Sequence, residues 1–138
     1  MEAHHIEIRH LSHQDLFELK AACNEVYPNS ALASWNEKVI SKLLTIFPDG
    51  QVCVCVDGKV VGCALSLIID YQQFGDDHSY DQITGKLSFS THDPKGDVLY
   101  GIEVFIHPEY RGLRLARRLY AARKELCENL NLRAIIAG

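Results

Sequence analysis

The sequence predicts an α/β (α+β) fold in which helices flank a mixed, mostly antiparallel sheet that contains one parallel strand pair. Two observations carry this prediction. Asp57-Gly58 stands between two β-branched runs, which indicates a two-residue hairpin and therefore two antiparallel strands. Further along, residues 99–106, 113–129 and 133–137 have the patterns of a strand, a helix and a strand, a right-handed crossover that makes the two strands parallel.

The first part of the chain combines a short strand with an amphipathic helix. Residues 6–9 are expected to form the strand. Ser12, with Asp15 three residues later, resembles a capping box, which starts a helix. An apolar stripe at helical spacing follows, and Pro28 stops it; its members are Leu16, Leu19, Cys23 and Val26.

A second amphipathic helix begins at Ser34, where Glu37 completes a further capping box, and it ends before the Pro-Asp-Gly sequence at residues 48–50. The hairpin comes next. Residues 70–97 are polar and punctuated by glycine, and the pattern assigns no element to them. Aromatic residues in this segment favour a folded excursion over a loose linker, and they are Tyr71, Phe74, Tyr80 and Phe89.

The helix expected at 113–129 has no side chain that can cap its start. Between Arg111 and Arg118 there is no Ser, Thr, Asp or Asn, although the first four N–H groups of a helix need partners outside it. Water or an anion can satisfy these donors, and the positive end of the helix favours an anion. Because this start follows a parallel strand, where open α/β sheets bind ligands, we expect an anion site. The apolar stripe of the helix is Leu115, Leu119, Ala122 and Leu126.

Composition predicts one soluble, cytoplasmic domain of 138 residues, of which 47% are hydrophobic and 23% are charged. We expect no signal peptide, because the first ten residues lack an apolar core, and no membrane partner, because no apolar run is long enough to span a bilayer. The net charge of −4 argues against a general nucleic-acid binder. Basic residues nevertheless gather near the end of the chain, which fits a solvated helix face or a local phosphate site; they are Arg111, Arg114, Arg117, Arg118, Arg123, Lys124 and Arg133.

The cysteines indicate a reducing compartment and no metal. Their number is odd, and all of them lie in runs typical of strands or helices, which favours reduced thiols in the cytoplasm; they are Cys23, Cys53, Cys55, Cys63 and Cys127. Cys53 and Cys55 face the same side of a strand, but no second cysteine or histidine pair stands at ligand spacing. We therefore predict that both are core residues.

The segment VFIHPEYRGLRLARRLY, residues 104–120, resembles the acetyl-CoA signature of the GNAT N-acetyltransferase superfamily. In that signature a strand ending in proline leads to an Arg/Gln-x-x-Gly-x-Gly/Ala loop and a helix. Arg111 and Ala116 fit the first and last positions of the motif, whereas Arg114 stands where the superfamily usually has glycine. The order of elements also matches this fold over nearly the whole chain.

Three segments are more specifically similar to the GNAT-type domain that is fused to carbon-nitrogen hydrolase (nitrilase-like) domains. They are ALSLIIDYQQFGDDHSYDQITG, THDPKGD and YRGLRLARRLYAARKELCENLNLR. In that group Arg-Gly-Leu-Arg-Leu is the usual form of the loop, so the arginine at position 114 agrees with it.

The resemblance implies an N-acetyltransferase that transfers acetyl from acetyl-CoA to an amine, either a small molecule or a lysine side chain, by direct attack. In the family, the strand before the loop hydrogen-bonds the pantetheine, and one of its backbone amides polarises the thioester carbonyl. The matching residues here are Val104, Phe105 and Ile106. The loop that would hold the pyrophosphate of coenzyme A on its backbone amides consists of Arg111, Gly112, Leu113, Arg114, Leu115 and Ala116.

Glu103 is the leading candidate for the catalytic base, because the attacking amine must lose a proton. A strand covered on both faces would desolvate this carboxylate and raise its pKa. The alternative is a structural ion pair with an arginine such as Arg133. His107 adjoins the motif and is expected to serve the turn before the next residue, Pro108, and His78 and His92 are weaker candidates.

Tyr110 and Tyr120 are candidates for protonating the leaving thiolate, although the helical spacing of Tyr120 favours packing. Two other classes of function stay open. The chain would be a non-catalytic acyl-CoA-binding module that regulates a carbon-nitrogen hydrolase, or a nucleic-acid-binding domain that uses the arginine-rich helix, whose binding would then depend steeply on salt.

GNAT domains normally continue beyond the position of Gly138 with a further helix and two strands. We therefore expect residues 1–138 to be a single GNAT-like domain that is truncated at its C-terminus, retains some coenzyme A affinity and acetylates amines poorly. An exposed edge on the last strand predicts association, as a homo-oligomer or with a fused or partner hydrolase domain.

Overall fold

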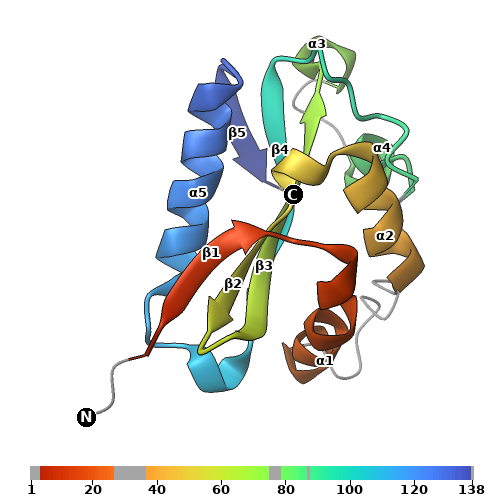
Figure 1. The fold of residues 1–138 in the computed structure, drawn as a ribbon. Coiled ribbons are helices and arrows are strands. Elements are labelled where there is room, and N and C mark those ends of the chain that lie inside the picture. Colours follow the sequence, from red (N-terminus) through yellow and green to blue (C-terminus); the bar gives the residue numbers. More distant parts are fainter. Residues whose placement is uncertain (1–3, 27–36, 75–78, 87, 138) are drawn as a thin grey trace.

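The computed structural model describes residues 4–26, 37–74, 79–86 and 88–137 of the chain (Figure 1). One sheet has the strand order β1-β2-β3-β4-β5. Its strands are β1 (Ile6–His10), β2 (Val52–Val56), β3 (Lys59–Ile69), β4 (Val98–Ile106) and β5 (Ala134–Ala137). Neighbouring strands are antiparallel except β4 and β5, which are parallel, so the mixed sheet expected from the sequence is confirmed.

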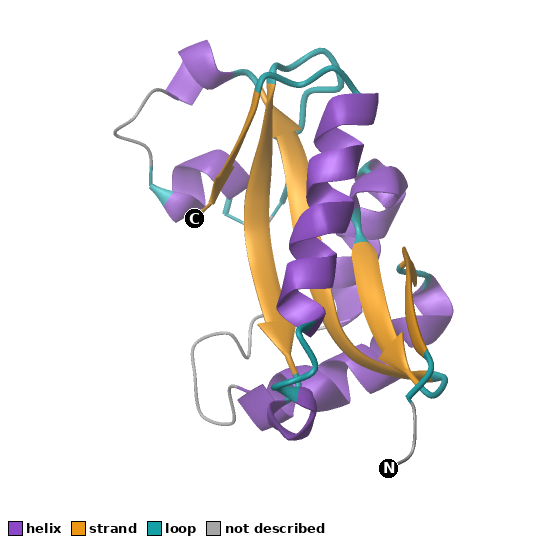
Figure 2. Cartoon of the chain, turned by 90° about the vertical axis from the view of Figure 1, so that its left-hand side faces the viewer, coloured by secondary structure: helices purple, strands orange, loops and turns teal. Residues whose placement is uncertain are grey.

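Helices cover both faces of the sheet, as the two views in Figures 1 and 2 show. On one face lie α1 (Leu16–Val26) and α2 (Glu37–Ile46), and on the other lies α5 (Leu115–Asn129). The prediction that the last helix begins at Leu113 is wrong by two residues. Arg114 has a φ of +59°, in the left-handed region, so the helix can begin only after it.

The local signals at the first helix and the hairpin are confirmed. Ser12 donates both its backbone N–H and its hydroxyl to Asp15 Oδ2, at 2.8 and 2.9 Å, and closes a short 3₁₀ turn that leads into α1. Asp57 and Gly58 have φ values of +51° and +85°, the two positive angles that a tight two-residue hairpin requires. The predicted signals at Pro28 and Ser34 lie outside the described residues.

The main core lies between the sheet and helices α1 and α2. Cys23, Cys53, Cys55 and Cys63 are buried in it as free thiols, and burial raises the pKa of Cys53 to about 12. These thiols are therefore protonated core residues, as the spacing of Cys53 and Cys55 predicts. No group of three or more His, Cys, Asp or Glu side chains that could hold a metal ion occurs in the part of the chain that the structure describes.

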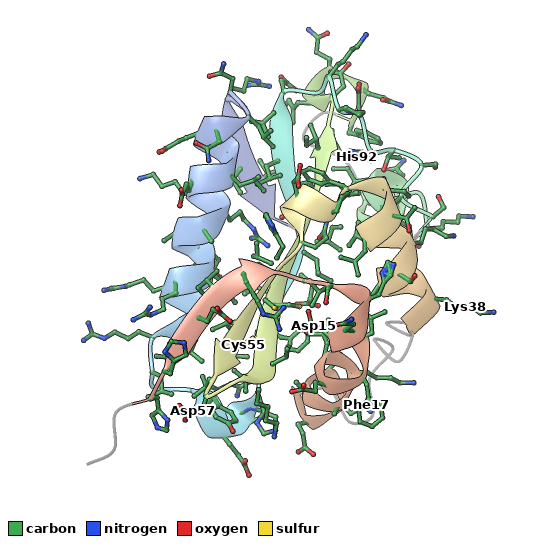
Figure 3. All side chains as sticks on the ribbon, viewed as in Figure 1. Asp15, Phe17, Lys38, Cys55, Asp57 and His92 are labelled. Carbon is green, nitrogen blue, oxygen red and sulfur yellow. The ribbon has the colours of Figure 1, made fainter. Side chains whose placement is uncertain are left out.

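The segment after β3 is a folded excursion, as its aromatic residues predict. It contains two short helices, α3 (Tyr71–Phe74) and α4 (Tyr80–Thr84), and the buried side chains of Ile83 and Phe89 join the main core. Tyr71 and Phe74 pack against the same core, whereas the side chain of Tyr80 lies outside the described residues. His92 stacks on Phe47 with ring centroids 4.6 Å apart (His92 is labelled in Figure 3).

The inner row of α5 differs from the predicted stripe. Leu115 and Leu119 are buried as expected, but Ala122 and Leu126 are only half-buried, and the buried positions of the next two turns are Arg123 and Cys127. Tyr120 is 56% exposed, so the prediction that it packs is wrong. Among the described helices, none is long and apolar enough to cross a membrane.

Candidate functional site

Strand β4 changes character half-way along its length. Its parallel pairing with β5 runs from Val98 to Gly101 and goes no further among the described residues. Immediately beyond, the register with β3 shifts, since Leu65 pairs with Glu103 and Ser66 with Gly101. This irregularity is a β-bulge, which bends a strand and is common beside active sites. The bulge therefore separates the part of β4 that pairs with β5 among the described residues from the part that carries Glu103, Val104, Phe105 and Ile106.

The loop after β4 is held by local contacts. His107 donates its backbone N–H to Val61 O at 2.7 Å, and its Nδ1 accepts the N–H of Glu109 at 3.1 Å. Its ring meets the ring of Tyr110 edge-on, with centroids 5.5 Å apart. The buried His107 thus serves the turn before Pro108, as predicted, and Tyr110 packs beside it.

The loop then presents the uncapped start of α5. No side chain caps the helix, whose N-cap residue is Arg114. Its first backbone bond runs from Arg118 N to Arg114 O at 3.4 Å, so the amides of Leu115 and Ala116 precede the first helical hydrogen bond. Gly112 has a φ of +95°, and a Cβ placed on it would meet no atom within 4 Å, so this side of the loop backbone is open.

The arginines around this start are exposed. They are Arg111, Arg114, Arg117 and Arg118. Leu115, by contrast, is buried, and Leu113 and Ala116 pack against the same small core under α5. The loop is therefore anchored by leucines on its inner side, while its cationic side chains face solvent near the positive end of the helix.

Glu103 is half-buried at the bulge, and its carboxylate lies against its own strand. The backbone N–H of Val104 donates to Glu103 Oε1 at 3.0 Å. The carboxylate also affects two buried thiols. Burial first and the negative charge of Glu103 second raise the pKa of Cys23 and of Cys63, which places this charge near the main core.

Arg133, the example given for an arginine that pairs with Glu103, has another partner. Arg133 pairs with Asp97, Nε to Oδ2 at 2.5 Å, and its guanidinium lies 5.2 Å from the ring centroid of Tyr71. The arginine near Glu103 is Arg123, which donates Nη2 to the backbone oxygens of Leu65 at 3.3 Å and of Glu103 at 3.4 Å. In the sequence, Arg123 stands out only as one member of a basic cluster.

Two signals in the sequence could have identified Arg123. It falls four residues after Leu119 and four before Cys127, in the inner row of the helix. Gly101 interrupts a strand, where glycine often marks a bulge or a close approach of another group. A Cβ on Gly101 would lie only 2.7 Å from Arg123 Nη1.

The other titratable candidates lie away from this region. His78 is outside the described residues. His92 accepts the N–H of Ile68 on Nδ1 at 3.1 Å, and burial lowers its pKa, so its role is structural. The exposed Tyr120 stands on α5.

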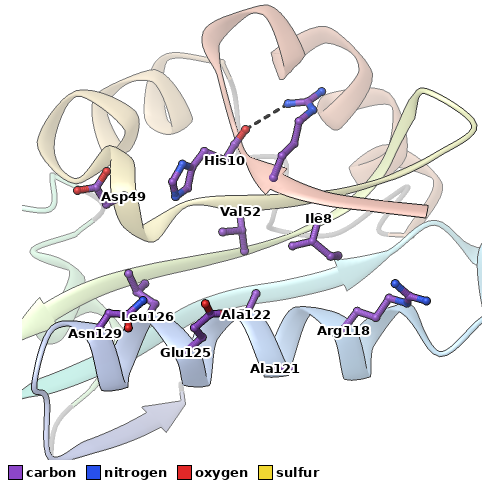
Figure 4. A pocket seen from close by; sticks show the side chains of 11 residues that line it. Ile8, His10, Asp49, Val52, Arg118, Ala121, Ala122, Glu125, Leu126 and Asn129 are labelled. Atoms are coloured by element: carbon purple, nitrogen blue, oxygen red, sulfur yellow. Dashed lines mark hydrogen bonds between the residues drawn. The ribbon is translucent and has the colours of Figure 1, made fainter. Parts of the chain in front are cut away.

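A separate groove of about 710 Å³ lies between α5 and the outer strands β1 and β2 (Figure 4). Its lining is Ile8, Arg9, His10, Asp49, Val52, Arg118, Ala121, Ala122, Glu125, Leu126 and Asn129. None of these residues belongs to β4 or to residues 111–116, so the groove and the loop are distinct features of the surface.

Comparison with known proteins agrees with this geometry. The model of the Acetyltransferase (GNAT) family matches residues 13–138. The chain is 34% identical over 131 residues to the "Probable hydrolase YhcX" of Bacillus subtilis (strain 168), covering 95% of this chain and 25% of that protein. It is 26% identical over 135 residues to the "Uncharacterized N-acetyltransferase YkwB" of the same organism, covering 96% of this chain and 60% of the relative.

The chain thus spans about a quarter and three fifths of the two curated relatives, and the first of them carries a hydrolase name, in accord with the resemblance to hydrolase-fused domains. Among solved structures, the loading GNATL domain of CurA from Lyngbya majuscula superposes with a TM-score of 0.78 at 25% identity. That match covers 96% of this chain and 64% of the other. On the family match, the fold and the loop between β4 and α5, the chain belongs to the GNAT acetyltransferase family.

Proposed function

We propose that this chain binds acetyl-CoA at the start of α5 and transfers its acetyl group to an amine by direct attack. The observation that carries the proposal is the open, uncapped helix start after the carboxyl end of strand β4, which carries a β-bulge at Glu103. Backbone amides from Arg111 to Ala116 would hold the pyrophosphate, and Val104 to Ile106 would accompany the pantetheine. Acetyl-CoA would supply an activated acyl thioester, whose C–S bond breaks as the amine nitrogen bonds to the acyl carbon; coenzyme A leaves as a thiolate, which takes up a proton from water.

The residues of this chain then have separate tasks. The Val104 N–H, at the bulge, would donate to the thioester oxygen and stabilise the negative charge that develops there. Glu103 would receive the proton that the amine loses as its nitrogen attacks. In this structure the two groups bind each other, so the carboxylate leaves the amide when a carbonyl oxygen takes that place.

Two glycines provide a matched test of the coenzyme site. Gly112 and Gly58 both have positive φ, and a methyl group added to either would meet no atom within 4 Å, so alanine at either position introduces comparable backbone strain. Only Gly112→Ala places a methyl group on the proposed loop. Calorimetry with coenzyme A should show weaker binding by Gly112→Ala and unchanged binding by Gly58→Ala, at similar losses of thermal stability. Equal affinities of both variants would contradict the site.

Turnover separates this proposal from its alternative. The match to a relative named as a hydrolase, of which the chain covers a quarter, favours a non-catalytic acyl-CoA-binding module that regulates a hydrolase as the second candidate. A panel of amines with acetyl-CoA, followed by thiol release, distinguishes the two. Thiol release that requires the amine supports transfer, whereas coenzyme A binding without turnover on any amine supports the binding module.

A further inference from the structure

Arg123 is a buried cation on the inner face of α5. Arg123 is only 5% exposed. It stands in a row of apolar side chains, with Leu119 one turn before it and Cys127 one turn after it. Those two neighbours belong to different small cores, one reaching Val54 and Ile106, the other reaching Leu99. The guanidinium thus stands between two apolar clusters, where an aliphatic side chain would be the ordinary occupant.

The contacts of Arg123 converge on the bulge between β3 and β4. Nη2 donates to Leu65 O at 3.3 Å and to Glu103 O at 3.4 Å, and these two residues are paired at the last register before the shift. Gly101 leaves the space for the guanidinium, since a Cβ there would lie 2.7 Å from Nη1 and 3.0 Å from Cζ. Residues of β3 and β4 therefore contact the side chain that α5 contributes.

Stability alone does not account for a cation at this position. Burial of the guanidinium opposes its charge, and Nε has no hydrogen-bond acceptor among the described residues. Replacement of buried charged groups by apolar ones of similar volume is often neutral or stabilising. A role in the reaction is a reason for a cation here.

The oxygen that Arg123 binds belongs to the same peptide group as the Val104 N–H. In a trans peptide the C=O and N–H bonds point in opposite directions, so fixing one fixes the other. A cation at the oxygen also draws electron density from the group and makes its N–H a stronger donor. The Val104 N–H already binds an anionic oxygen, Glu103 Oε1 at 3.0 Å.

We infer that Arg123 is a positioning residue, which holds and polarises the peptide between Glu103 and Val104 so that the Val104 N–H is aimed at the thioester oxygen of the acyl donor. This inference rests on the proposed function. Arg123 itself touches neither substrate, and its effect is carried by one peptide group.

The test uses Arg123→Met, which keeps an unbranched apolar stem and removes the hydrogen-bond donors, and Arg123→Lys, which keeps the charge. Arg123→Met should lower kcat for acetyl transfer at least tenfold while KM for acetyl-CoA and the Kd of coenzyme A change less than twofold. Arg123→Lys should restore part of kcat. Cys127→Ala, one turn further along the same row, is the control for a merely structural loss and should leave kcat within twofold of the parent.

Gly101→Ala approaches the same contact from the strand, because its methyl group would displace the guanidinium. It should lower kcat as Arg123→Met does, and the double variant should be no worse than either single one. Wild-type kcat in Arg123→Met, or fully additive losses in the double variant, would overturn the inference.

A readout without turnover keeps the inference testable if the proposed function fails. The amide proton of Val104, observed by ¹⁵N-resolved NMR, should move upfield in Arg123→Met by more than the amide proton of any other β4 residue. The chemical shift of this amide proton should not change in Cys127→Ala. A Val104 resonance that is the same in the parent and in Arg123→Met would refute the polarised peptide, even in a protein that transfers no acetyl group.

Discussion

Val104 donates its backbone amide to the carboxylate of the residue before it, Glu103, over 3.0 Å. Within a strand such a donor normally binds a neighbouring strand, but here the strand bends at a bulge and the Val104 N–H binds a side chain. One residue therefore occupies, with its side chain, the donor that the proposed reaction needs. We therefore expect that binding of an acyl donor to the Val104 N–H frees the Glu103 carboxylate from that N–H at the same time.

Glu103→Gln tests this relationship. Glutamine can still accept the Val104 N–H but cannot take a proton at neutral pH, so kcat should fall about 10²- to 10⁴-fold while coenzyme A affinity is retained. The acidic limb of the pH–rate profile should disappear, because the carboxylate that titrates there is gone. Steady-state kinetics across pH measures both effects. Glu125→Gln, an exposed change on α5, is the control, and a full kcat in Glu103→Gln would assign the base elsewhere.

Arg114→Gly should make the protein more stable and bind coenzyme A more weakly. The left-handed backbone at this position, φ +59°, costs a non-glycine residue about 1 kcal/mol, which glycine recovers. The exposed guanidinium, lost in the variant, is expected to contact the phosphates, so the loss in affinity should shrink as salt is added. Thermal unfolding and calorimetry measure the two quantities.

Asn131→Gly is the matched control for this change. Asn131 also has a left-handed φ, +57°, but lies beyond the far end of α5. It should gain less stability than Arg114→Gly, because asparagine adopts this conformation more readily than arginine, and its coenzyme A binding should not change. Tighter binding by Arg114→Gly would mean that the arginine obstructs the loop instead of serving it.

The pair of Arg9 and Asp15 predicts an acid-sensitive contribution to folding. Arg9 donates Nη1 and Nη2 to both carboxylate oxygens, at 2.7 and 2.8 Å, and these bonds lower the pKa of Asp15 from 3.8 to about 2. A lowered carboxylate pKa stabilises the fold above the unfolded value, and this contribution is lost as pH falls from about 4 to about 2. Asp15→Asn should cost about 2 kcal/mol at neutral pH.

Urea unfolding at a series of pH values checks the Asp15 prediction. The stability difference between the parent and Asp15→Asn should narrow as pH falls through the same interval. Asp49→Asn, at an exposed aspartate, should run parallel to the parent. A difference that is constant with pH would show that the loss is one of packing and not of charge.

His92 predicts a second pH effect, of opposite origin. Burial lowers its pKa below 6.5, and its neutral Nδ1 accepts the Ile68 N–H at 3.1 Å. The unfolded chain then binds a proton more readily, so stability falls as pH drops below about 6.5 until the lower pKa of the folded state is reached. His92→Phe keeps an aromatic ring on Phe47 and should remove this slope in chemical unfolding measured between pH 7 and pH 5. Persistence of the slope would assign it to another group.

Local signals in the sequence were sufficient where neighbouring residues determine the structure. Asp57-Gly58 specifies its own turn, and the bare helix start after Arg111 is a local property of the chain. Long-range partners were not predictable in this way. Arg133 meets Asp97 across 36 positions, and Arg123 meets a bulge whose place depends on how β3 and β4 register.

The same distinction explains the excursion after β3. Its order depends on Ile83 and Phe89 reaching the main core and on His92 stacking on Phe47 from another part of the chain. None of these contacts leaves a periodic pattern. Helical spacing alone could not distinguish an inward arginine from an outward one, because an arginine on a helix is usually solvated, and the glycine at position 101 is the second signal that is needed.

An NMR titration with coenzyme A decides where the ligand binds. The largest changes in amide shift should fall on Gly112 to Ala116 and on Val104 to Ile106, because these amides are expected to bind the pyrophosphate and the pantetheine. The groove between α5 and β1 is the internal comparison, since it is hollow and partly cationic but lacks a helix start. Shifts concentrated on Ile8, Val52 and Ala122, with the loop amides unmoved, would contradict the account.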